Sequence, residues 1–80
     1  MRLPRDVGGM EPARKLNRFG YEITRQTGSH IRLTTQQHGD HHVTVPRHEA
    51  LRVGTLNGIL AEVAAHLEIS RDQLAKELFE

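Results

Sequence analysis

The clearest hydrophobic pattern lies in the second half of the chain, between residues 55 and 68. Apolar residues recur there every three or four positions, at Leu56, Ile59, Leu60, Val63, Ala64 and Leu67. This spacing places them on one face of an α-helix, with Thr55 in position to cap its first turn. After Ile69, the stretch from Ser70 to Gln73 has the form of a capping box and predicts a short last helix.

A second helix is predicted near the N-terminus, from about residue 10 to residue 19. Pro12 is acceptable in a first helical turn, and Gly20 is a typical residue just beyond a helix C-terminus. The apolar face carries Ala13, Leu16 and Phe19, whereas three basic residues off that face are expected to be solvated: Arg14, Lys15 and Arg18. Residues 1–9 have no periodic pattern, and we interpret them as an extended lead-in.

Three segments between these helices alternate apolar and polar residues, which is typical of β-strands with one buried face. They are residues 21–26, 29–35 and 41–46, with reversals expected at Thr27-Gly28 and at Gly39-Asp40. The alternation points one set toward the core: Tyr21, Ile23, Ile31, Leu33, Val43 and Val45. It points a polar set the other way: Glu22, Thr24, Gln26, His30, Arg32, Thr34, His42 and Thr44.

These elements predict an α+β fold with the order α-β-β-β-α and a short extra C-terminal helix. The three strands form an antiparallel sheet, and both main helices must cover its single apolar face. The polar face of the sheet, which carries His30, is therefore expected to stay open. At 80 residues, the chain is expected to be a single domain spanning residues 1–80.

Composition narrows the function classes. The chain has no cysteine, which excludes disulfides and thiolate metal sites. It has neither a signal-peptide core nor an apolar run of membrane-spanning length, so we expect a cytoplasmic protein without a membrane role. Net charge is +1, but residues 1–35 carry +4 and residues 36–80 carry −3. This division favours one face for an anionic partner.

The histidine-rich stretch from His38 to His42 invites a metal-site interpretation, which the spacing does not support. His41 and His42 are adjacent in a predicted strand and so point to opposite faces. His38 and Asp40 lie in a turn, and no zinc-motif spacing is present. We expect no specific metal site and no cofactor.

Three sequence blocks in a fixed order carry a family resemblance. They are LNRFGYEITRQTGSHIRL, VTVPRH and GTLNGIL, which together span residues 16 to 60. In this order and at these spacings they resemble the HicA/YcfA family of small toxins from type II toxin–antitoxin systems.

The resemblance implies a double-stranded-RNA-binding-domain-like fold and the activity of an mRNA interferase. Such a toxin cleaves mRNA and is neutralised by a cognate HicB-type antitoxin. The family's catalytic histidine is the one in the Gly-Ser-His motif, which here is His30. Gly28 and Ser29 are interpreted as the turn that supports it, because glycine readily takes a positive φ.

The residues around His30 suit RNA cleavage by acid–base catalysis. RNA supplies its own nucleophile, the 2′-OH, so a histidine can move protons while arginine grips the phosphate. His30 and Arg32 lie two positions apart and so share a strand face. Further candidates for RNA contact are Arg25, Arg47, His42 and His48.

Other interpretations remain open at this point. Arg25 and Arg32 are as compatible with a plainly solvated strand face as with phosphate contact. The second proton-transfer group is not assigned, and the candidates for it are His42, on the same outward face, and His48, which follows the VTVPR segment. A non-catalytic RNA-binding module of the same fold is the main alternative function, and a homologue that binds only protein is a third.

Overall fold

The structure is a computed structural model that describes residues 7–47 and 50–79. Its elements, in chain order, are helix α1 (Met10–Lys15), the 3-10 helix η1 (Leu16–Phe19), strands β1 (Glu22–Thr27), β2 (His30–Thr35) and β3 (His41–Pro46), and helices α2 (Val53–Leu67) and α3 (Arg71–Phe79). No described helix is both long enough and apolar enough to cross a membrane.

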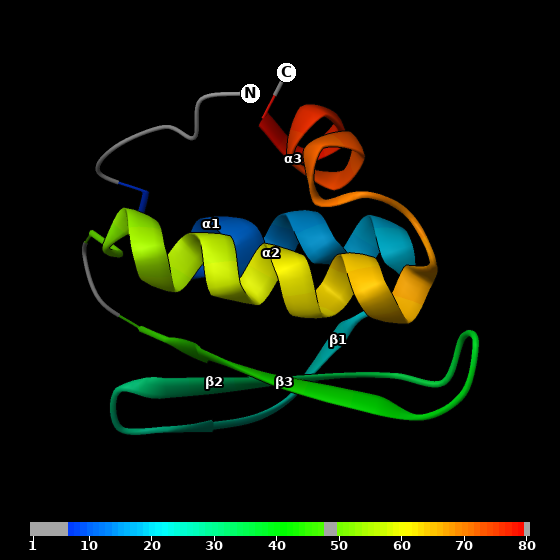
Figure 1. Ribbon diagram of the computed structural model, residues 1–80. Helices are drawn as coiled ribbons and strands as arrows, with labels where there is room; N and C mark the ends of the chain where they lie inside the picture. The colour runs from blue at the N-terminus through cyan, green and yellow to red at the C-terminus, as the bar shows by residue number, and fades with distance from the viewer. Residues whose placement is uncertain (1–6, 48–49, 80) are drawn as a thin grey trace.

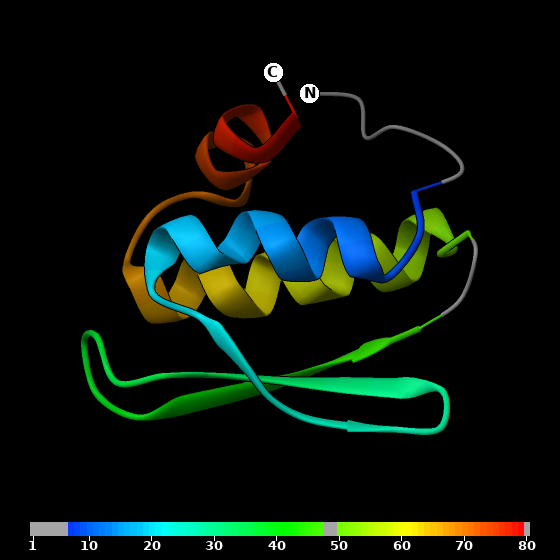
Figure 2. The same cartoon turned by 180° about the vertical axis from the view of Figure 1, so that it is seen from behind.

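The elements stack in layers (Figures 1 and 2). The antiparallel sheet has the order β1-β2-β3, and α1 with η1 lies beside α2 over one of its faces. Helix α3 packs on the side of these helices that faces away from the sheet. The predicted α+β architecture, with both main helices on one sheet face and a short C-terminal helix, is confirmed. It is compatible with the double-stranded-RNA-binding-domain-like layout.

The core forms between the inward-facing residues of the strands and the apolar face of α2. Ile31, Leu33, Val43 and Val45 are at most 3% exposed, as their alternation predicted. The stripe of α2 packs against them and buries Leu56, Ile59, Leu60, Val63 and Ala64, while Leu67 is partly buried at its edge. Removal of this apolar surface from water is the main driving force of the fold.

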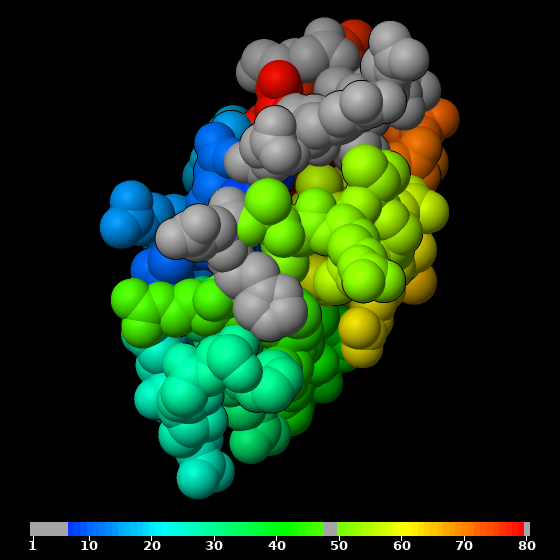
Figure 3. Space-filling view, turned by 90° about the vertical axis from the view of Figure 1, so that its left-hand side faces the viewer, coloured from blue at the N-terminus to red at the C-terminus, as the bar shows by residue number. Residues whose placement is uncertain are grey.

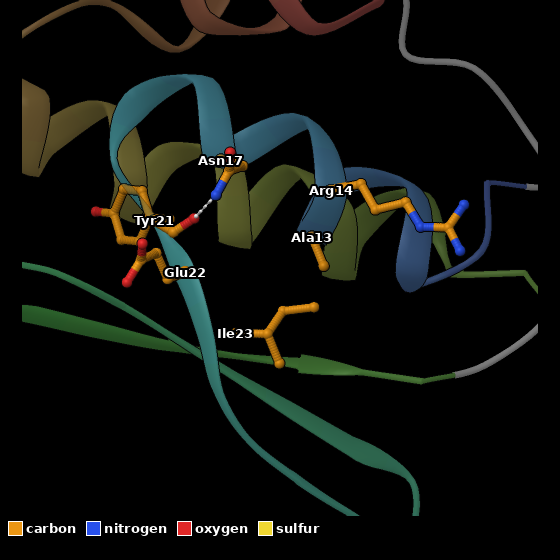
Figure 4. Close-up of a pocket in the computed structure, with 6 residues that line it drawn as sticks. All are labelled: Ala13, Arg14, Asn17, Tyr21, Glu22 and Ile23. Carbon is orange, nitrogen blue, oxygen red and sulfur yellow. Dashed lines mark hydrogen bonds between the residues drawn. The ribbon is translucent and has the colours of Figure 1, made fainter.

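The first strand departs from the predicted alternation. Ile23 pairs with Leu33, but Arg25 pairs with Arg32, so a β-bulge at Thr24 shifts the register by one residue. Gln26 is exposed, but the shift places it opposite Ile31, on the helix-covered face of the sheet and not on the predicted outward face. Ile23 was predicted to face the core, but it is 42% exposed. It borders an open groove between β1 and the first helices (Figure 4).

Two predicted helix starts have different outcomes. Thr55 is not the N-cap of α2, because the helix already begins at Val53 and the Leu56 N–H donates to the carbonyl of Arg52 at 3.0 Å. At α3, Ser70 Oγ accepts a hydrogen bond of 3.0 Å from the Gln73 N–H, so this half of the capping box is confirmed.

The first helix is tied to the last one. Lys15 Nζ donates to the Leu78 carbonyl at 2.7 Å, and Arg18 donates to the Glu77 carbonyl at 3.0 Å. From the sequence, both residues were expected to be solvated. They instead donate hydrogen bonds to carbonyls at the C-terminal end of α3. Gly20 ends the helical segment with φ +89°, as predicted.

The described part of the lead-in packs against the rest of the fold. Val7 is 4% exposed, and its carbonyl accepts a hydrogen bond of 2.7 Å from the Leu51 N–H. Gly9 has helical backbone angles rather than the extended ones expected. It also lies so close to Pro46 that a Cβ on it would fall 2.0 Å from the Pro46 carbonyl oxygen. The start of the chain thus supports the end of β3.

Candidate functional site

His30 is the first residue of β2, directly after a two-residue turn formed by Gly28 and Ser29. Gly28 has φ +52°, as expected of a glycine in a tight hairpin turn. The reversal is one residue later than predicted, since Thr27 is still in β1 and pairs with His30. The turn lies at the end of the sheet shown in Figure 3, where the hairpin (blue-green) projects beyond the helices.

The His30 side chain lies on the open face of the sheet. His30 alternates with the buried Ile31, is itself exposed, and pairs with Pro46 of β3. Its imidazole forms no hydrogen bond with residues 7–47 or 50–79, so none of these residues occupies either ring nitrogen. That is a suitable state for a group that must accept or donate a proton.

Arg47 lies next to the same turn. Its backbone N–H donates to the Ser29 carbonyl at 2.6 Å, and the residue is exposed. The chain leaving β3 is therefore held against the Gly28–Ser29 turn, close to His30. His48, the other candidate in this segment, lies outside the described residues.

The bulge in β1 brings the other two candidate arginines together. Because the register shifts at Thr24, Arg25 lies directly opposite Arg32, on the same face as His30. Like charges directly opposite each other across two strands destabilise a sheet. No described acidic side chain forms an ion pair with either arginine. An anion bound between the two guanidinium groups would relieve this repulsion.

His42 shares the outward face but belongs to a different row of residues. Thr34 Oγ1 lies 2.8 Å from Thr24 Oγ1 and 2.8 Å from His42 Nδ1, and these contacts form a hydrogen-bonded row across all three strands. This row is two pleat repeats from His30, or roughly 13 Å along the strand. His42 is thus too far away to be the second proton-transfer group at the same phosphate.

The rows nearest His30 leave that second group unassigned among the described residues. The His30 row contains Thr27 and Pro46, and the next row contains Arg25, Arg32 and Thr44. None of these is a histidine or a carboxylic acid. What the rows do supply, one pleat repeat from the imidazole, is a pair of permanent positive charges.

A separate polar cluster at the far end of the sheet faces the helices. The Tyr21 hydroxyl lies 2.7 Å from His41 Nδ1, and the His41 ring stacks on His66 with centroids 4.4 Å apart. His66 Nε2 donates to the carbonyls of Gln37 and Gly39. Burial, with a smaller effect of the Glu62 carboxylate, raises the pKa of Tyr21 to about 12. This cluster joins α2 to the sheet and does not reach the open face.

The positions of His41 and His42 bear on the metal interpretation. His41 faces the helices and His42 the open side, as the alternation predicted, so they do not form a joint pair of ligands. In the part of the chain that the structure describes, no three His, Asp or Glu residues lie close enough together to hold a metal ion.

Sequence reasoning found the outward set on β2 and β3 but missed the bulge that places Arg25 beside Arg32. It also missed the bonded row of Thr24, Thr34 and His42. Threonine and histidine at alternating strand positions are the only signal that could have indicated such a row.

Comparison with known proteins identifies one family. A family model described as the HicA toxin of bacterial toxin–antitoxin systems matches residues 10–64, which include α1, the whole sheet and most of α2. No curated protein and no solved structure matches the chain.

Proposed function

The chain belongs to the HicA family of bacterial toxin–antitoxin toxins, and on that premise we propose that it is an endoribonuclease that cleaves mRNA with His30 as general acid or base. The observation that carries the proposal is the position of His30. Its imidazole lies on the open face of the sheet, one pleat repeat from the opposed Arg25 and Arg32.

The proposed reaction uses the RNA's own 2′-oxygen as the nucleophile. A base removes the 2′-OH proton as the O2′–P bond forms, the P–O5′ bond breaks, and the departing 5′-oxygen takes up a proton. The products are a 2′,3′-cyclic phosphate and a 5′-hydroxyl. His30 serves one of the two proton transfers, a contribution typically worth about 10²- to 10⁴-fold in rate. Because no external nucleophile has to be generated, we propose that the reaction needs no metal ion.

Positive charge beside the phosphate is the second requirement. Negative charge grows on the non-bridging oxygens as the phosphorus becomes five-coordinate, and fixed cations stabilise it. Arg25 and Arg32 supply two guanidinium groups that can each grip phosphate oxygens bidentately. Arg47, beside the Gly28–Ser29 turn, and His42, on the more distant row, are proposed to contact the neighbouring nucleotides.

The protein partner follows from the family. A toxin of a toxin–antitoxin pair is controlled by its antitoxin, and we propose a HicB-type protein as that partner. The toxin would act in the cytoplasm, where mRNA is present. Binding of an antitoxin to the folded toxin would also raise its stability by mass action.

Cleavage of a long single-stranded RNA in the presence of EDTA tests the proposal. We expect the wild-type chain to cut and His30→Ala to lose activity by at least about 10²-fold. His30→Ala should melt at the wild-type temperature, because the exposed imidazole has no described hydrogen bond to lose.

His38→Asn is a matched control for this experiment. It also removes an exposed imidazole, but from the β2–β3 turn, and asparagine tolerates the positive φ of 59° at that position. It should cut like wild type. If wild type and His30→Ala both bind RNA and neither cuts it, the catalytic proposal fails and a non-catalytic RNA-binding module becomes the better interpretation.

A further inference from the structure

A shallow hollow lies beside the hydrogen-bonded row of Thr24, Thr34 and His42. Its lining includes Glu22, Thr24, Thr34, Gln36 and Gln37, so hydroxyl, amide and carboxylate groups border it. These residues come from the start of β1, the end of β2 and the turn that follows. The hollow adjoins the groove of Figure 4, and Glu22 lines both of them.

The hydroxyl groups of the hollow are held in place before any ligand arrives. Thr34 Oγ1 is fixed by its contacts of 2.8 Å with both Thr24 and His42. The turn is fixed as well, because the Gln37 N–H donates to Oγ1 of the buried Thr35 at 3.1 Å. Such preorganisation lowers the entropic cost of binding a small planar ligand.

Glu22 gives the hollow its chemical selectivity. It pairs with Thr34 across the strands and is exposed, and no described cation forms an ion pair with it. An ionised carboxylate can only accept hydrogen bonds, so it favours a ligand edge that carries an amino group. On nucleobases, Glu and Asp accept from the amino group of cytosine, whereas uracil has a carbonyl oxygen at that position.

We propose that this hollow is a nucleobase subsite that prefers a base bearing an exocyclic amino group. The inference rests on the proposed RNA substrate. It adds the position, relative to the scissile phosphate, at which a base is recognised. The hollow lies two pleat repeats from His30, roughly 13 Å along β2. The recognised base therefore belongs to a nucleotide beyond the scissile phosphate, and the substrate is a single strand with an accessible base edge.

Binding of two matched probes tests the subsite. They are the fully 2′-O-methylated hexamers of cytidine and uridine, which cannot be cut because their 2′-oxygens are blocked. We expect the wild-type chain to bind the cytidine hexamer about tenfold more tightly, the size of one hydrogen bond to a charged group. Glu22→Gln should reduce the preference for the cytidine hexamer to between about onefold and threefold, because glutamine can also donate to the uracil oxygen.

Glu11→Gln is the matched control, since it removes the same charge from an exposed position on α1, which does not line the hollow. It should keep the wild-type ratio. Equal binding of both hexamers by wild type, or an unchanged ratio in Glu22→Gln, overturns the subsite and leaves the proposed function intact. Failure of wild type to bind either hexamer overturns both.

Discussion

Tyr21 is the single tyrosine of the chain, so its ionisation can be followed without interference. Its ring is buried, and its hydroxyl is bonded to His41 at the end of the sheet far from His30. Because burial opposes the phenolate form, we expect a folded-state pKa of about 12 against 10.0 for an ordinary tyrosine. Tyrosinate absorbance in the first milliseconds after a pH jump measures this value before the chain unfolds.

The same shift predicts how stability depends on alkaline pH. A pKa that is higher in the folded chain contributes stability in full below pH 10, and this contribution is lost as the pH rises toward 12. Urea midpoints measured across this range should fall more steeply for wild type than for Tyr21→Phe. In denaturant the phenol should titrate near ~10. The same value in the folded chain would mean that the ring is open to water.

The face on which each residue lies could largely be predicted from the sequence. Strict alternation in β2 and β3 placed His30, Arg32, Thr34 and His42 on the open side, because the side-chain period of a strand is two. Arg25 could not be placed correctly, since the bulge at Thr24 is set by how β1 pairs with β2 and not by the residues of β1 alone. The roles of these residues in RNA cleavage stay predictions.

At the scale of elements, the hairpin of β1 and β2 carries the two arginines proposed to bind phosphate, and their opposition has a cost in stability. The opposed Arg25 and Arg32 repel each other in the free protein. Arg32→Glu converts this contact into an opposite-charge pair. We therefore expect it to raise the free energy of unfolding by about 0.2–1 kcal/mol while weakening RNA binding. Urea denaturation and binding of the 2′-O-methyl hexamers measure the two effects.

Arg14→Glu is the control for that prediction, because it makes the same charge reversal at an exposed site on α1. It should not stabilise the chain in the same way. The gain from Arg32→Glu should also shrink at about 1 M salt, where exposed charges are screened beyond roughly 3 Å. A loss of stability in Arg32→Glu would show that the two arginines do not repel each other in solution.

Element boundaries were harder to predict than the elements themselves. The stripe from Leu56 to Leu67 identified α2, but no side-chain cap marks its start, and the helix runs back to Val53. Thr55, the predicted cap, lies inside the first turn of the helix. By contrast, Ser70 caps α3 as its spacing to Gln73 predicted, because that bond is local and independent of tertiary packing.

At the scale of the whole molecule, the buried core and the proposed RNA site lie on opposite sides of the sheet. The helices bury the apolar side, and the residues proposed to bind RNA lie on the other side, which no described helix covers. The amphipathic patterns predicted this division, since a single apolar sheet face has to be covered by both main helices. They did not predict that α3 would form a further layer, because its position depends on contacts such as that of Lys15 with Leu78.

The distance of α3 from the open face gives a last prediction. Leu74 of α3 is fully buried, so Leu74→Ala should lower the free energy of unfolding by about 2–5 kcal/mol. Below its melting temperature, the folded variant should still bind the hexamers with wild-type affinity and keep the amide resonances of β2. Lys76→Ala, an exposed change on the same helix, should alter neither quantity. Weaker RNA binding by folded Leu74→Ala would instead mean that packing of the last helix reaches the sheet surface, and that the two sides of the molecule are energetically coupled.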